Sequence, residues 1–362
     1  MRLLRLRSLV LGVALAGMVG FAAGQQTAAE KTADQVFKNI QVFQGKPANE
    51  LRPTMDFIAS SLGVHCSFCH NTADFSSDAK PPKRRARQMV EMVYAVNKST
   101  FDGREEVNCY TCHRGSPHPE GRLSVASLVA TSSPGIGERV SGEGEAQASP
   151  ARSQLPSAKD ILNKYLAAIG GTDALGAVHA ETVEAERAGF GRNTPVTLTR
   201  ADGKLLLVAG TAKSGYDGAQ FWTVGRRGTD LDPESSTVAQ LRTDVPLYPA
   251  AGLDAAKARV FGVRTVNGHK AYVVAVRTDH GFASYDFDTE TGLLLRYTTG
   301  APTYLGMLPL QVNYDDYRAV GAIKLPFAIT YANHEFHWER KVTSVKLNPS
   351  VDPARFAAPS AK

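Results

Sequence analysis

Hydrophobic and polar residues follow two different periods along this 362-residue chain, and the period changes after residue 178. Before that point, several segments have apolar residues at every third or fourth position, as on one face of a helix. After it, apolar residues recur at every second position, as along a strand with one buried face. The pattern predicts a multidomain protein in which a mainly α domain precedes an α+β domain.

Three segments of the first half have the helical pattern. A capping box of Thr32 and Gln35 begins the first. The second begins near Asn49 or Arg52 and ends before Gly63, a residue that tolerates the left-handed conformation of a helix end. The helices are expected over residues 32–43, 52–62 and 85–97.

The second half begins with helices and continues with strands. Ser157 caps an amphipathic helix that Gly170 ends, and a short helix follows over residues 172–178. Turn residues at Asn267-Gly268 and at 288–292 predict hairpins. The strands are expected over residues 182–190, 196–199, 205–208, 220–224, 271–277, 282–287, 293–298, 311–317 and 328–331, with a helical interruption over 254–261. This order predicts an α+β domain with a large curved antiparallel sheet.

The N-terminus and a polar stretch in the middle divide the chain into four parts. Arginines followed by an apolar run and small residues predict a signal peptide over residues 1–24, and hence export; an uncleaved anchor is the alternative. Residues 121–157 are rich in Pro, Gly, Ser and Ala, which predicts a flexible linker. The two domains then cover residues 25–120 and 158–358.

Composition and charge add two constraints. With 43% hydrophobic residues, the chain has enough apolar side chains for two or three domain cores. The formal net charge of +6 is mild, so it allows an acidic protein partner or an anionic membrane surface, and we predict no nucleic-acid binding. All four cysteines lie in two short motifs, which leaves none for a structural disulfide.

The two motifs are Cys66-Ser67-Phe68-Cys69-His70 and Cys109-Tyr110-Thr111-Cys112-His113. C-x-x-C-H is the attachment signature of c-type haem, in which both thiols bond to the haem and the histidine ligates the iron. We therefore predict two covalently bound haem c groups. A four-cysteine zinc site or disulfides are the alternatives. The 39 residues between the cysteine pairs exceed the spacer of about 15–20 residues that is usual in such zinc sites.

Methionines on the preceding helices are candidates for the sixth ligands of the two irons. Three of the six methionines belong to the haem domain, because two leave with the signal peptide and Met307 lies in the β-rich half. Met55 precedes the first motif on the apolar face of its helix and is predicted to ligate the first iron. Periodicity does not choose between Met89 and Met92 for the second. A thioether opposite histidine raises the reduction potential, as expected of an electron carrier.

Basic residues crowd the start of the third predicted helix, where the helix dipole disfavours cations. They are Lys80, Lys83, Arg84, Arg85 and Arg87. We expect a solvated face there. Pairing with haem propionates or docking of a partner is the alternative.

The combined motifs of residues 33–117 resemble the cytochrome c subunit of photosynthetic reaction centres. The matching stretches are KNIQVF at 38–43, Met55 eleven residues before CSFCHN, RQMVEM, and CYTCHRG. The resemblance implies that each haem is held by a helix, a loop and a C-x-x-C-H. It assigns Cys66, Cys69, His70 and Met55 to the first haem, and Cys109, Cys112, His113 and Met89 to the second. This chain has two motifs, whereas the well-known members of the family carry four haems.

The second domain is similar to outer-membrane-lipoprotein carrier-like domains. The similarity rests on YDDYR at 314–318, KLPF at 324–327 and the ending DPARF at 352–356. It implies a half-open β-barrel over helices that holds an acyl chain or a partner protein.

Together these features predict a periplasmic dihaem c-type cytochrome. It would transfer electrons to a membrane or soluble redox partner, such as a photosynthetic reaction centre, and would not be an enzyme. We predict no catalytic residue. Two alternatives stay open: a dihaem peroxidase-like enzyme in which one iron lacks its sixth ligand, and an envelope protein that binds lipid or lipoprotein and has accessory haems.

Overall fold

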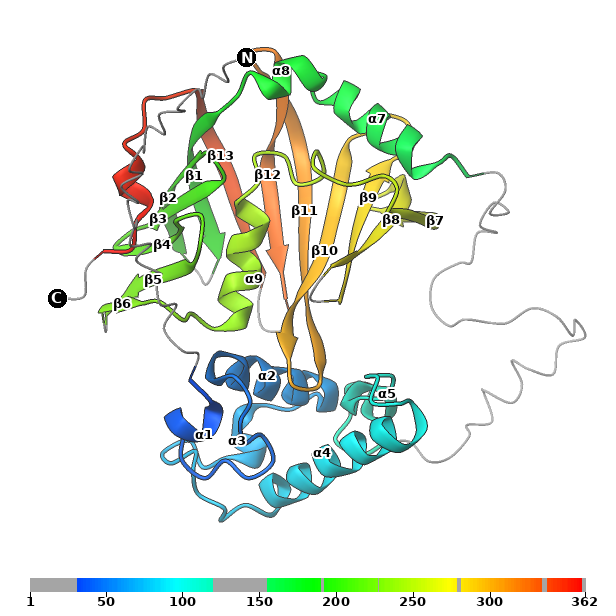
Figure 1. The fold of residues 1–362 in the computed structure, drawn as a ribbon, viewed down its shortest axis with the longest axis vertical. Coiled ribbons are helices and arrows are strands. Elements are labelled where there is room, and N and C mark those ends of the chain that lie inside the picture. The colour runs from blue at the N-terminus through cyan, green and yellow to red at the C-terminus, as the bar shows by residue number, and fades with distance from the viewer. Residues whose placement is uncertain are drawn as a thin grey trace, which may run out of the picture. The chain divides into compact units, whose positions relative to one another are not determined.

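The computed structural model describes residues 31–119, 155–189, 192–226, 228–278, 281–333 and 337–359. The predicted signal peptide and nearly all of the predicted linker lie outside the described residues, so both stay predictions, as do the domain limits. The described residues form a helical part, 31–119, and a sheet part, 155–359 (Figure 1). Both belong to one compact unit that begins at Lys31.

The helical part contains one long helix and several short ones. Its elements are α1 (Ala33–Val36), η1 (Ala48–Glu50), α2 (Leu51–Leu62), α3 (Cys66–Cys69), α4 (Pro81–Thr100) and α5 (Cys109–His113). α2 ends as predicted before Gly63, whose φ of 65° is left-handed. α4 begins earlier than predicted, because its two prolines occupy the first turn, where a helix needs no N–H donor.

The first predicted helix is wrong beyond Val36, where the chain leaves the helix and folds back. The Ala33 N–H donates to the Lys46 carbonyl at 2.7 Å, which closes this loop. Phe43, expected on the helix, is instead buried against Tyr304 of the sheet part, with ring centroids 4.9 Å apart. A tertiary contact therefore overrides the helical spacing of the apolar residues.

The sheet part is built on one sheet of thirteen strands, all paired antiparallel. The strands are β1 (Ala180–Gly189), β2 (Arg192–Ala201), β3 (Lys204–Ala209), β4 (Ala212–Tyr216), β5 (Phe221–Gly225), β6 (Gly228–Asp230), β7 (Arg259–Val266), β8 (His269–Thr278), β9 (Gly281–Asp288), β10 (Leu294–Thr303), β11 (Gly306–Val320), β12 (Ile323–Ala332) and β13 (His337–Leu347). Their order is β6-β5-β4-β3-β2-β1-β13-β12-β11-β10-β9-β8-β7, so the described sheet is open, with β6 and β7 at its edges.

Helices cover this sheet and close its core. They are α7 (Ala158–Ala168), α8 (Thr172–Gly176), α9 (Ser235–Asp244) and η3 (Pro353–Phe356). Tyr165 of α7 packs on Phe287 of β9, with ring centroids 5.2 Å apart. Leu241 of α9 is buried among apolar residues of β1, β2 and β3, and Figure 1 shows α9 in front of the strands. The predicted fold class, a mainly α part followed by an α+β part with a curved open sheet, is confirmed.

The sheet part differs from the predictions in several details. Four of its strands, β4, β6, β7 and β13, were not among the predicted ones. The helical interruption over residues 254–261 is wrong: the chain makes turns to Ala258 and β7 begins at Arg259. The Lys257 and Ala258 N–H groups both donate to the Asp254 carbonyl, which makes one turn that does not continue as a helix. α9 was not predicted, because short helices with weak amphipathicity give little periodic signal.

The hairpin that joins β10 and β11 contacts the helical part. The Tyr304 N–H donates to Thr54 Oγ1 at 3.0 Å, the Tyr304 hydroxyl donates to the Pro47 carbonyl, and the Tyr94 hydroxyl donates to the Tyr304 carbonyl at 3.1 Å. Buried residues of both parts form one apolar cluster: Phe43, Leu51, Phe57, Val90, Val93, Cys109, Ala239, Ala301, Tyr304, Leu305, Leu308 and Leu310. The core of the helical part is therefore completed by the sheet part.

Candidate haem sites

The first motif forms a single helical turn, α3, followed directly by His70. The His70 N–H donates to the Cys66 carbonyl at 2.9 Å, and the two cysteines are free thiols. Cys66 is exposed and Cys69 is half-buried, and burial raises the pKa of the Cys69 thiol. A compact turn with two free thiols and a histidine at its end is the arrangement that covalent haem attachment needs.

The ring of His70 is oriented by the loop that follows it. Its Nδ1 lies 3.1 Å from the Phe75 carbonyl, and since a carbonyl only accepts, Nδ1 carries the proton. Nε2 is then the ring nitrogen with a free lone pair, as in metal-ligating histidines. Burial lowers the pKa of His70, and the nearby cation Lys83 lowers it further, while the hydrogen bond to Phe75 opposes them. The side chain is thus favoured in the neutral form that can ligate iron.

The second motif is α5, another short helix that ends in a histidine. Asn108 caps it by accepting the Thr111 N–H at 3.3 Å. Cys109 is buried, which raises the pKa of its thiol to about 11, whereas Cys112 is exposed. His113 Nδ1 lies 2.9 Å from the Ser116 carbonyl. The second histidine is therefore oriented in the same way as the first, with Nε2 left for a metal.

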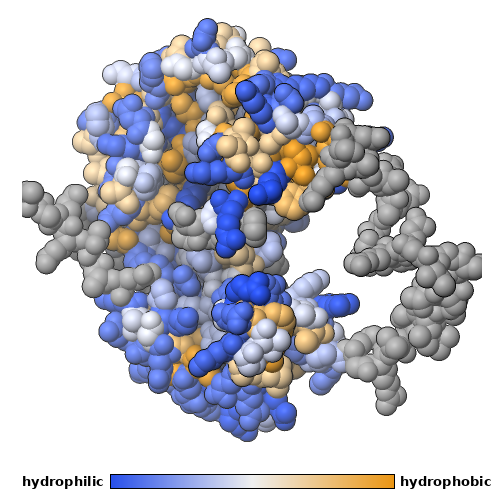
Figure 2. Space-filling view, turned by 45° about the vertical axis from the view of Figure 1, so that its right-hand side comes forward, coloured by the Kyte–Doolittle hydropathy of each residue, from blue (hydrophilic) through white to orange (hydrophobic). Residues whose placement is uncertain are grey.

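Large apolar side chains are exposed beside both motifs. Phe68 and Tyr110, inside the motifs, are 42% and 57% exposed, and Phe75, beside the His70 ring, is 54% exposed. Figure 2 shows orange patches among the blue residues of the helical part. Exposed aromatic side chains can form a surface to which an apolar group such as a porphyrin binds. The residues present therefore fit two bound porphyrins.

The predicted sixth ligands lie on α2 and α4. Met55 is half-buried and packs against the apolar cluster that contains Cys109. Met89 is half-buried, whereas Met92 is 46% exposed. The assignment of Met55 and Met89 as ligands stays a prediction.

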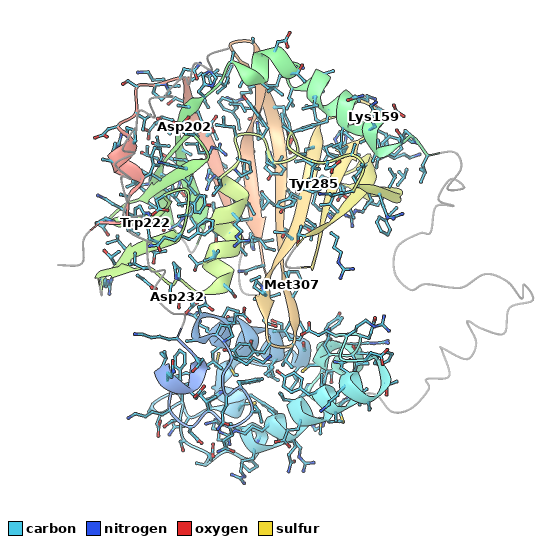
Figure 3. All side chains as sticks on the ribbon, in the orientation of Figure 1. Lys159, Asp202, Trp222, Asp232, Tyr285 and Met307 are labelled. Carbon is cyan, nitrogen blue, oxygen red and sulfur yellow. The ribbon has the colours of Figure 1, made fainter. Side chains whose placement is uncertain are left out.

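Met307, set aside because it lies in the β-rich half, is on the hairpin of β10 and β11 that contacts the helical part. It is labelled in Figure 3, on β11 next to Gly306. A Cβ placed on Gly306 would lie 3.7 Å from Asn108 Nδ2, so the hairpin contacts the residue that caps the second motif. The Met307 methyl lies against Gly300 on the paired strand, which gives this side chain a packing role within the hairpin.

The two cysteine pairs do not combine into one metal site. Among the described residues, which include all four cysteines, no group of three or more His, Cys, Asp or Glu side chains is placed to hold a metal ion. The four thiols are also unpaired with one another.

Two of the five basic residues at the start of α4 are largely buried, whereas Arg84 and Arg85 are exposed. The Lys83 side chain is only 10% exposed, and the Arg87 side chain 14%. Arg84 donates to the Asp78 carbonyl and Lys80 to the Ser67 carbonyl. These cations hold the loop that follows the first motif, so the prediction of a solvated face is wrong for Lys83 and Arg87.

The sheet part has a small cavity with a charged lining. The cavity has a volume of about 50 Å³ and is lined by residues of β1, β2, β12, β13 and α9, among them Arg340 and Asp244. Arg340 donates twice to Asp244, at 2.8 and 2.9 Å, and the Tyr331 hydroxyl donates to the same carboxylate at 2.6 Å. Pockets for drug-sized ligands measure roughly 300–1,000 Å³, so this cavity offers no room for an acyl chain as it stands.

No helix of the described residues has the length and apolar character to cross a membrane.

Comparison with known proteins identifies relatives of the helical part. Residues 16–187 match the family model of the photosynthetic reaction centre cytochrome C subunit. The chain is 34% identical to cytochrome c-554 of Chloroflexus aurantiacus over 87 residues, 22% of this chain and 21% of that protein. It is 33% identical to the photosynthetic reaction center cytochrome c subunit of Thermochromatium tepidum over 92 residues (24% and 23%). With that of Rubrivivax gelatinosus the identity is 35% over 94 residues (24% and 25%).

The chain spans about a quarter of the length of these curated relatives, or less. Even so, the predicted relationship to reaction centre cytochrome c subunits is confirmed for this part of the chain. Similar solved structures include a DUF1329 family protein from Desulfovibrio piger, with a TM-score of 0.40, 13% identity and coverage of 56% of this chain and 98% of that one. A LolA superfamily protein from Nitrosomonas europaea gives a TM-score of 0.37 at 9% identity, with coverage of 56% and 98%.

Proposed function

We propose that this chain, a relative of reaction centre cytochrome c subunits over its helical part, is an exported dihaem c-type cytochrome that carries electrons. One observation supports this most strongly: the chain presents two C-x-x-C-H turns, and in each the histidine Nδ1 is held by a nearby backbone carbonyl. Both Nε2 atoms are left for iron, and exposed aromatic side chains lie beside both turns.

Each turn has a defined task in this proposal. Cys66 and Cys69 would hold the first haem through thioether bonds, with His70 and Met55 as its iron ligands. The second group of residues repeats these roles: Cys109, Cys112, His113 and Met89. When bound, the haem supplies an iron that gains and loses one electron. In each site a histidine and a methionine of this chain would hold the iron and would leave it no position for a substrate.

The compartment and the partner are part of the same proposal. The predicted signal peptide directs the chain to the periplasm, where it associates with a membrane or soluble redox protein. The names of the relatives make a photosynthetic reaction centre one such partner, but this chain spans only a quarter of their length. The sheet part would bind a lipid, a lipoprotein or the partner itself.

Haem content is the direct test of this function. The protein would be produced in a bacterial host with a c-type haem maturation system. Denaturation followed by pyridine haemochrome assay should give two haems per chain that stay covalently attached. Cys66→Ala with Cys69→Ala should reduce this to one haem, and Cys109→Ala with Cys112→Ala should do the same. Haem that dissociates on denaturation, or a wild-type chain with fewer than two haems, would contradict the proposal.

A further inference from the structure

The two proximal histidines donate to carbonyls that differ in what else they accept. The Phe75 carbonyl, which takes the Nδ1–H of His70, also accepts a hydrogen bond from Lys83 Nζ at 2.9 Å. The Ser116 carbonyl takes the Nδ1–H of His113, and no lysine or arginine among the described residues donates to it. The two sites therefore share the motif but differ in the environment of the histidine.

Lys83 is fixed behind the first motif as a cation. Its Nζ donates to the carbonyls of Phe75, Ser76 and Ser77 at 2.9 to 3.0 Å. Three acceptors require three N–H donors, which a side-chain amine has only as an ammonium. The Asp78 carboxylate lies 3.2 Å from the same atom, and the Lys83 side chain is only 10% exposed. Water therefore screens this charge much less than it screens a surface lysine.

We propose that Lys83, as a positioning residue acting on His70 through the Phe75 carbonyl, raises the reduction potential of the haem bound at the first motif. This inference rests on the proposed function, because it needs a haem at each motif. It adds a difference in reduction potential between the two haems that the shared C-x-x-C-H pattern does not indicate.

Two physical effects give the same sign. A histidine that donates strongly to its acceptor gains imidazolate character and stabilises ferric iron. Because Lys83 already donates to the Phe75 carbonyl, that oxygen is a weaker acceptor for His70, and the ferrous form is favoured. A buried positive charge also disfavours the more positive, ferric form.

Other charges on the loop and on α4 do not cancel this effect. Three cations lie there besides Lys83: Lys80 donates to the Ser67 carbonyl of the first motif, and Arg84 and Arg87 donate to Asp78. The carboxylates on the loop are Asp74 and Asp78, so four cations face two anions. At the second motif, the adjacent cation Arg114 is exposed to water.

The test is a spectroelectrochemical titration of the haem-loaded full chain, resolved into two one-electron steps. Lys83→Gln keeps N–H donors but removes the charge. It should lower one midpoint by a roughly five- to tenfold change in the equilibrium constant for reduction, about 40–60 mV at 59 mV per tenfold. Asp78→Asn removes the counter-charge and should raise the same midpoint. Lys98→Gln, an exposed lysine in the last turn of the same helix, is the matched control and should move neither step.

The outcomes separate this inference from the proposed function. A haemochrome assay comes first, and a wild-type chain without two covalent haems overturns the function itself. If both haems are present, opposite shifts of one midpoint in the two variants support the role of Lys83. Unmoved midpoints, or equal shifts of both, overturn it. If Lys83→Gln does not load haem, Asp78→Asn still tests the charge effect at the first haem. An upward shift of one midpoint supports the role of Lys83, and an unmoved midpoint overturns it.

Discussion

The two C-x-x-C-H turns have the same residue pattern but are held in place by different means. The first is supported by its own neighbourhood in sequence, since the loop after His70 is fixed by cations from the start of α4. The second is supported by a distant segment, the hairpin of β10 and β11, whose residues share an apolar cluster with Cys109. The short motif thus provides the residues that could bind a cofactor. The surrounding residues decide how rigidly each histidine is held and which electrostatic field acts on it.

This contrast makes the second site dependent on the sheet part. The cluster around Cys109 includes Tyr304, Leu305 and Leu308 from the hairpin, all nearly fully buried. Among the described residues, none of the residues 66–70 of the first motif belongs to a buried apolar cluster, and Phe75 beside His70 is exposed. Of the residues assigned to the first haem, Met55 alone packs on the cluster around Cys109. We therefore expect changes in the hairpin to disturb the second haem more than the first.

The largest expected effect follows from Tyr304→Ala. This change removes a buried ring that packs on Phe43 and whose hydroxyl donates to the Pro47 carbonyl. Loss of such a side chain costs about 3–5 kcal/mol of unfolding free energy, measured by urea unfolding. In the haem-loaded protein, the spectrum and midpoint of the second haem should change more than those of the first. Tyr304→Phe, which keeps the ring, should cost only about 1 kcal/mol.

Asp244→Asn is a control with a similar cost at a residue that does not belong to the apolar cluster around Cys109. It breaks a buried pair with Arg340, which should cost about 3–5 kcal/mol near pH 7. Both haem midpoints should nevertheless stay unchanged. If this variant disturbs the second haem as much as Tyr304→Ala does, the effect of the hairpin is only general destabilisation.

The same aspartate predicts a dependence on pH. Burial works to raise the pKa of Asp244, but Arg340, Tyr331 and Arg200 outweigh it and hold the pKa below its usual range. Because the folded pKa is lower than the unfolded one, the stabilisation is present above about pH 4 and is lost as the pH falls through the folded pKa. Urea midpoints of the wild type and Asp244→Asn should therefore converge in acid. A constant difference between them down to strong acid would contradict this.

Thr54→Val should have an intermediate effect on the link between the two parts. The Thr54 hydroxyl accepts the Tyr304 N–H at 3.0 Å and donates to the Glu50 carbonyl at 2.7 Å. Its loss leaves a buried N–H without an acceptor, at a cost of about 1–3 kcal/mol. Faster hydrogen exchange at the Tyr304 amide is the specific signature. Thr100→Val, at the exposed end of α4, is the matched control and should change neither quantity.

The smallest effect is expected for Met92→Ala. Met92 is 46% exposed, so its truncation should change the unfolding free energy by no more than about 0.5 kcal/mol. It should also leave both haem spectra as they are. Met89→Ala, by contrast, should open one iron to an added ligand such as imidazole. The reverse result would exchange the assignment of the two methionines.

Much of the fold was predictable because local patterns and tertiary contacts agree. The alternation of apolar residues after residue 178 gave the antiparallel sheet, and Gly63 gave the end of α2. The chain around Phe43 was not predictable, because its burial depends on Tyr304, which is far away in the sequence. The helix assigned to residues 254–261 failed because the chain makes only one turn, from Asp254 to Ala258, before β7 begins.

The candidate site shows the same division. Cysteine and histidine spacing sufficed to predict both turns, because covalent attachment fixes that spacing. The burial of Lys83 could not be predicted, because a run of basic residues usually faces water. The sequence pattern does not indicate that three backbone carbonyls accept from this lysine. The part played by the hairpin was hidden too, because contacts such as that between Tyr304 and Pro47 leave no local signal.

Carbon monoxide binding to the reduced, haem-loaded protein tests the central claim most directly. An electron carrier with both axial positions filled at each iron has no site for this ligand, so the visible spectrum should not change when the gas is added. A spectral change at one haem of the two would mean that an iron has an open position. That result would contradict the carrier proposal and favour a haem enzyme.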